Sequence, residues 1–109
     1  LTMSALDWSN FGQFVHDEII NDKCLGKFYK EGITNAVDTK RDGVKYGYQF
    51  WVYNVNGVPT LIMTGHGGFF NVVNTTNNTI VTIFSVDEKY EYGNLFSKGT
   101  ISRLASEIN

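Results

Sequence analysis

The spacing of hydrophobic residues predicts a helix at the start of the chain. Over residues 4–20, apolar side chains recur every three or four positions, at Trp8, Phe11, Val15 and Ile19. This spacing places them on one face of an α-helix. Ser4 stands where its hydroxyl can accept a hydrogen bond from the N–H of Asp7, as in a capping box at a helix start. We therefore expect an amphipathic helix over residues 4–20.

The following segment, residues 21–43, is mainly polar and contains glycines at positions 26, 32 and 43. Within it, "KCLGKFYKEGI" has the composition of a short helix that ends near Gly32. We expect a loop here that includes one or two helical turns.

From Tyr46 onward the hydrophobic spacing changes to alternation, which is typical of strands. We expect four strands, in "YGYQFWVYNV" (46–55), "TLIMTGHGG" (60–68), "FFNVVN" (69–74) and "TIVTIFSV" (79–86). Asn56-Gly57 suits the first turn, and Pro59 is excluded from a central ladder. Helical spacing returns at residues 94–107. The order predicts an α+β fold in a single domain over residues 1–109, with an antiparallel sheet of about four strands flanked by N- and C-terminal helices.

The last predicted strand carries apolar residues on both of its faces. Ile80 and Phe84 fall on one face, and Val81 and Ile83 fall on the other. A sheet that is apolar on both sides needs a covering layer on each. Two helices cover one face well and the second only in part, so we expect missing chain or a partner.

Composition and charge exclude several classes of function. The 109 residues are 42% hydrophobic, which predicts a packed core, and the net charge of −2 argues against nucleic-acid binding. No apolar run approaches the roughly 18 residues of a membrane span. Cys24 is the only cysteine, and His16, Cys24 and His66 lack the spacing of zinc ligands, so we expect no metal and no cofactor. The start, "LTMSALDW", has no basic n-region, so we expect no signal peptide. It begins with Leu1 inside a helical pattern, so we expect a piece of a longer chain.

The stretch Thr64–Phe70, "TGHGGFF", interrupts an apolar run with three glycines and a histidine. A phosphate loop would need Lys-Ser/Thr after the glycines, whereas here Phe69 and Phe70 follow. A lipase-type oxyanion loop would need a Gly-x-Ser-x-Gly elbow, which the chain lacks. Two interpretations remain: a β-bulge or tight strand end, or a backbone that comes close to a ligand.

The order of these features resembles the C-terminal portion of the serine β-lactamase and penicillin-binding-protein superfamily. The likeness is to class C β-lactamases, esterases and 6-aminohexanoate-dimer hydrolases. "YGYQFWV", a hairpin, "GHGG", further strands and a final helix follow the family's order, and "MSALDWSNFG" is similar to its Met-Thr-Ala-x-Asp-x-x-x-Phe-Gly helix. The resemblance covers nearly the whole chain at low identity, and the order of the motifs carries more weight than any one of them.

The resemblance implies a site at the glycine run. His66, Gly67 and Gly68 match the family's Lys-Thr-Gly or His-x-Gly motif, and the backbone N–H of Phe69 would then be one oxyanion donor. Glycines would remove the side chains that block a substrate from the strand. The resemblance implies that His66 binds the polar end of an acyl substrate; a histidine with only a structural role in the strand is the alternative.

The chain departs from the family at the catalytic residues. No serine is followed by lysine three positions later, so the Ser-x-x-Lys nucleophile is absent. Tyr92-Gly93-Asn94 has the form of the family's Tyr-x-Asn motif but follows the last strand, so we interpret it as a coincidence. We expect a portion of a hydrolase that is inactive alone, whose partner is the missing N-terminal part and whose parent acts on a small acyl substrate.

The alternative is a stand-alone binding or dimerisation module that uses the aromatic face of the sheet. If the helical domain of the parent is missing, we expect an exposed apolar face and a homodimer or higher assembly, with these candidate contacts: Tyr48, Phe50, Trp51, Ile62, Phe69 and Phe70. The sequence does not distinguish a periplasmic from a cytoplasmic location in a bacterium.

Overall fold

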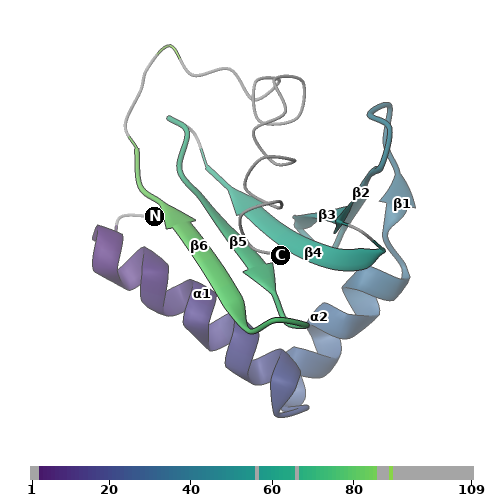
Figure 1. Ribbon diagram of the computed structural model, residues 1–109, viewed down its shortest axis with the longest axis horizontal. Helices are drawn as coiled ribbons and strands as arrows, with labels where there is room; N and C mark the ends of the chain where they lie inside the picture. The colour runs from purple at the N-terminus through teal and green to yellow at the C-terminus, as the bar shows by residue number, and fades with distance from the viewer. Residues whose placement is uncertain (1–2, 56, 66, 86–88, 90–109) are drawn as a thin grey trace.

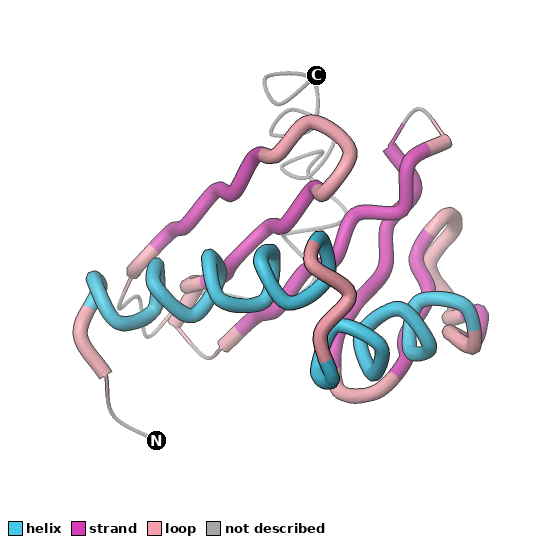
Figure 2. The backbone as a smooth tube through the Cα atoms, turned by 90° about the horizontal axis from the view of Figure 1, so that it is seen from below, coloured by secondary structure: helices cyan, strands magenta, loops and turns pink. Residues whose placement is uncertain are grey.

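Two helices precede an antiparallel sheet in the computed structural model, which describes residues 3–55, 57–65, 67–85 and 89. Helices α1 (Ala5–Ile20) and α2 (Cys24–Thr34) lie on the same face of the sheet (Figures 1 and 2). The strands pair in chain order as β1 (Val37–Asp38), β2 (Val44–Gly47), β3 (Phe50–Val55), β4 (Val58–Thr64), β5 (Phe70–Asn74) and β6 (Thr79–Ile83). The prediction of an α+β fold with an antiparallel sheet is confirmed.

The prediction of about four strands is wrong, because six strands form within the described residues. The segment 46–55, expected as one strand, is a hairpin in which β2 ends at Gly47 and β3 begins at Phe50. Tyr48 and Gln49 form its turn with φ of 51° and 74°. Positive φ at both central residues is the requirement of a two-residue type I′ turn, whose usual sequence is Asn-Gly. The Tyr-Gln pair hid this turn from sequence analysis.

Helix α2 is longer than the one or two turns expected for this segment. Its N-cap, Lys23, makes no side-chain capping bond, so the sequence lacks a start signal. The helix is held instead by packing against α1. A Cβ added at Gly26 would lie 1.8 Å from the carbonyl oxygen of Glu18, so the two backbones approach at a distance that only glycine permits.

Helix α1 confirms its predicted bounds and its apolar face. The N–H of Asp7 donates to the hydroxyl of Ser4 over 3.1 Å, as predicted for the cap. Val15 and Ile19 are buried in the main core cluster, with partners from three strands: Phe50, Val52, Leu61 and Val73. The core therefore lies between α1 and the middle of the sheet.

A second apolar cluster lies on the sheet face away from the helices. Neighbouring residues of a strand point to opposite faces, so Ile62 and Val72 belong to this cluster while Leu61 and Val73 belong to the core. Phe70 is the third buried member of this cluster. Its partly buried members are Trp51, Tyr53, Val81 and Ile83. The prediction that both faces of the sheet are apolar is confirmed.

The prediction of an exposed apolar face for association is wrong for three of its six residues. Phe50, Ile62 and Phe70 are only 2%, 0% and 4% exposed, and Phe50 packs toward the helices rather than sharing a face with Trp51. These three side chains are already covered and offer little surface to a partner. Homodimerisation itself stays a prediction.

The predicted helix at 94–107 and Tyr92-Gly93-Asn94 lie outside the described residues.

Candidate functional site

The glycine run forms the loop of the hairpin between β4 and β5. Strand β4 ends at Thr64, which pairs with Phe70 at the start of β5. The N–H of Gly65 donates to the carbonyl of Phe69 over 2.9 Å and closes the loop. The expectation that the strand continues through Gly68 is therefore wrong, and the chain turns here. His66 lies outside the described residues.

Two glycines of this loop have backbone conformations that other residues rarely adopt. Gly67 and Gly68 have φ of +90° and +89°, and both are buried. With no Cβ, glycine adopts positive φ at no steric cost. A tight strand end is one of the two interpretations that the sequence left open, and the turn accounts for both glycines without a ligand.

Phe69, the expected oxyanion residue, has its side chain packed among other aromatic rings. Its ring meets Trp8 of α1 edge to face at 5.9 Å and stacks on Phe84 at 5.7 Å. A Cβ added at Gly65 would lie 2.3 Å from the Phe69 ring. These contacts hold the Phe69 side chain between α1 and the residue that follows β6, and its carbonyl is held by the N–H of Gly65.

A buried amide ties the strand after the loop to α1. The Asn71 side chain is fully buried, and its Nδ2 donates to the carbonyl of Trp8 over 2.7 Å. Its Oδ1 accepts from the hydroxyl of Thr82 on β6 over 2.6 Å. Sequence analysis missed this network, since an asparagine in an apolar strand carries no pattern that names its partner.

A second polar cluster joins the middle of α1 to the β5–β6 turn. His16 is buried, with its Nδ1 3.1 Å from Asp17 Oδ1 and its Nε2 3.2 Å from Asn78 Oδ1. The hydrogen bonds from His16 and then from Gln13 hold the pKa of Asp17 below its usual value. Asn78 adopts φ of 56°. The cluster brings no serine or cysteine to the imidazole in any contact that the structure records, so it is a tether between two elements.

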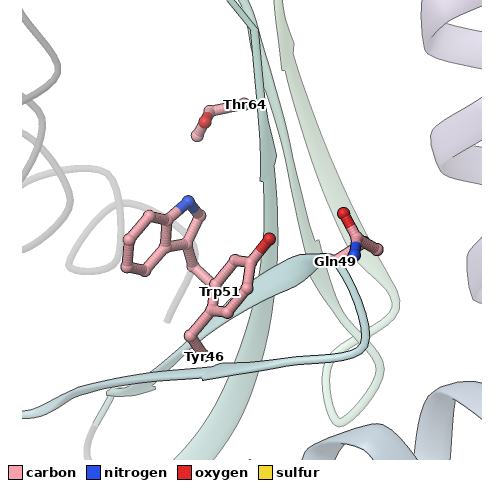
Figure 3. Close-up of a pocket in the computed structure, with 4 residues that line it drawn as sticks. All are labelled: Tyr46, Gln49, Trp51 and Thr64. Atoms are coloured by element: carbon pink, nitrogen blue, oxygen red, sulfur yellow. The ribbon is translucent and has the colours of Figure 1, made fainter. Parts of the chain in front are cut away.

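A pocket opens beside the glycine loop on the sheet face away from the helices. It has a volume of about 510 Å³ and is lined by Tyr46, Gln49, Trp51 and Thr64 (Figure 3). Trp51 of β3 pairs with Ile62 of β4, and Thr64 lies two residues beyond Ile62 on the same face of that strand. Thr64 directly precedes Gly65, which places the pocket next to the loop.

The part of the chain that the structure describes contains no group of three or more His, Cys, Asp or Glu residues able to hold a metal ion. Neither described helix is long and apolar enough to cross a membrane. Comparison of the chain with protein-family models, curated proteins and solved structures finds no match.

Proposed function

We propose that this chain is the C-terminal sheet portion of a β-lactamase-like serine hydrolase, in which the glycine loop forms part of an acyl-transfer site. The observation that supports this most is the β4–β5 loop itself. There Gly67 and Gly68 lack side chains and Phe69 is fixed by its aromatic contacts to Trp8 and Phe84. A rigid backbone N–H is what an oxyanion donor requires, because it stabilises developing charge without reorganising.

In this proposal the Phe69 N–H is one donor to the oxyanion, and the nucleophile's own N–H is the other. The two glycines are buried, so an acyl substrate reaches the loop from the side of Thr64, where the pocket opens. The nucleophile comes from a preceding part of the parent protein, since no serine of this sequence has lysine three residues later. The parent cleaves an ester, an amide or a β-lactam through a serine-linked acyl intermediate.

The first test uses a fluorophosphonate and a penicillin as covalent probes, read by intact mass. The 109-residue chain alone is expected to remain unlabelled, because a serine without a lysine or another base is a weak nucleophile. Stoichiometric labelling of any serine of this chain would overturn the proposal.

The second test applies to the intact parent and removes the proposed donor. Phe69→Pro eliminates the backbone N–H, and loss of one oxyanion donor lowers kcat by about 10² to 10³. Phe69→Leu is the matched control, since it keeps the N–H and an apolar side chain. Equal losses in the two variants would show that the residue acts through packing alone.

A stand-alone binding module is the second candidate function. The pocket of Tyr46, Gln49, Trp51 and Thr64 favours it, because its lining combines aromatic and polar side chains, as sites for small ligands do. The coding sequence that precedes Leu1 separates the two candidates: an in-frame Ser-x-x-Lys supports the hydrolase, and its absence supports the module.

A further inference from the structure

We propose that the pocket of Tyr46, Gln49, Trp51 and Thr64 binds a neutral saccharide. This inference concerns binding by the chain alone and does not depend on the proposed acyl-transfer function. The pocket's volume of about 510 Å³ lies within the range of sites that bind small ligands.

The chemistry of the lining residues is the first argument. All four described lining side chains are uncharged, so they match a neutral ligand. Tyr46 and Trp51 pack with ring centroids 4.8 Å apart and present an apolar aromatic surface. Gln49 and Thr64 add an amide and a hydroxyl, and each of these groups both donates and accepts hydrogen bonds.

A sugar ring matches this combination of surfaces. Its faces carry C–H groups that pack on aromatic rings, and its rim carries hydroxyls that donate and accept. In Figure 3 the rings of Tyr46 and Trp51 lie together, and the nitrogen-bearing edge of the Trp51 indole is turned toward Thr64. The two rings and the Thr64 hydroxyl therefore lie on one face of the sheet, and Gln49 lines the pocket from the β2–β3 turn.

The backbone at Gln49 is the second, independent argument. Gln49 adopts φ of 74° in the β2–β3 turn, a conformation that favours glycine or asparagine. Its neighbour Tyr48 has the same strain, but Tyr48 packs on the Phe28 ring at 5.0 Å and donates to Glu31 over 3.1 Å. The Gln49 side chain instead lines the pocket, and a strained residue at a pocket is a reason to look for function there.

The test is a fluorescence titration with Trp51 as the reporter. The chain has two tryptophans, and Trp8→Phe leaves Trp51 alone while keeping a ring in the aromatic cluster. The titrants are cellotriose, maltotriose and triacetylchitotriose, each added separately. We expect at least one to change Trp51 emission saturably, with a Kd in the millimolar range or below.

Three further variants, made in the Trp8→Phe background, assign the effect to the pocket. Gln49→Gly removes the amide while suiting the positive φ, and Thr64→Val removes the hydroxyl at equal size; each is expected to weaken binding at least fivefold. Tyr48→Asn is the control, since it suits the same turn and leaves the pocket lining intact, and its affinity should stay within twofold. Circular dichroism confirms that each variant is folded.

Three outcomes would overturn the proposal. One is the lack of a saturable change with all three sugars. Another is binding that is unaltered in both Gln49→Gly and Thr64→Val. The third is an equal loss in Tyr48→Asn, which would show that the turn rather than the pocket matters.

Discussion

The side-chain amide of Asn71 on β5 donates a 2.7 Å hydrogen bond to the main-chain carbonyl of Trp8 on α1. Trp8 also contacts Phe69, the residue that ends the glycine loop. One buried asparagine thus fixes the distance between the helix and the strand that begins directly after the loop. The geometry of the loop depends on this attachment as well as on its own glycines.

Replacing Asn71 tests the attachment. Asn71→Ala removes both buried hydrogen bonds and leaves a cavity, so we expect a loss of about 2–4 kcal/mol in the free energy of unfolding. Thr82→Val removes only the hydroxyl bond and should cost about 1 kcal/mol. Urea denaturation measures both. Because the residues share one network, the double variant should lose less than the sum of the single losses; full additivity would contradict the network.

Gly26 tests the close approach of the two helices. In Gly26→Ala the added Cβ would lie 1.8 Å from the Glu18 carbonyl oxygen, so a backbone must move. We expect a loss of more than about 2 kcal/mol in unfolding free energy, the cost of overpacking. Gly57→Asn is the control, since it has open space around its Cβ and φ of +82°, which asparagine tolerates. A loss in Gly26→Ala no larger than in the control would contradict this packing.

Because of the Asp17 carboxylate, we expect the free energy of unfolding to fall as the solution becomes acidic. Hydrogen bonds from His16 and Gln13 lower its pKa below 3.8 in the folded protein. A lowered folded pKa gives stability that is present above the unfolded pKa and lost as the pH falls through the folded value. Asp17→Asn should therefore be less stable than the natural chain at pH 6, and the gap should close below pH 3.8. Urea midpoints between pH 6 and pH 2.5 measure the gap; a constant gap would contradict the assignment.

The β2–β3 turn offers a stabilising substitution. Gln49 has φ of 74° with a side chain, and a glycine at this position would remove that strain at the cost of chain entropy. We expect Gln49→Gly to raise the free energy of unfolding by about 0.5–1 kcal/mol. Tyr48→Gly should instead destabilise the protein, because it loses the contacts to Phe28 and Glu31. Thermal unfolding measures both variants: changes in melting temperature of opposite sign would support the turn geometry, and changes of the same sign would contradict it.

Much of the fold follows from periodicity in the sequence. The stripe of Val15 and Ile19 predicted α1, and alternation predicted the strands that became β4, β5 and β6. The turn at Tyr48 and Gln49 was missed because neither residue is a usual turn former. Helix α2 was underestimated because its N-cap residue makes no capping bond; its first turn is bound by α1 instead, where Glu18 Oε2 accepts from the N–H of Leu25 over 3.2 Å.

The candidate site was only partly predictable. Glycine chemistry located Gly67 and Gly68, since positive φ is a local property. The pocket was not predictable, because Tyr46, Trp51 and Thr64 come together only through the pairing of β2 with β3 and of β3 with β4. The inclusion of Phe50 on the exposed face failed for the same reason: register decides which side of the sheet a residue occupies.

The proposed role as part of a serine hydrolase is tested most directly by sequencing the transcript upstream of the codon for Leu1. The proposal predicts an open reading frame that continues upstream and encodes a Ser-x-x-Lys motif in frame with this chain. A stop codon upstream of Leu1 in the same frame, with no such motif between it and Leu1, would contradict the proposal.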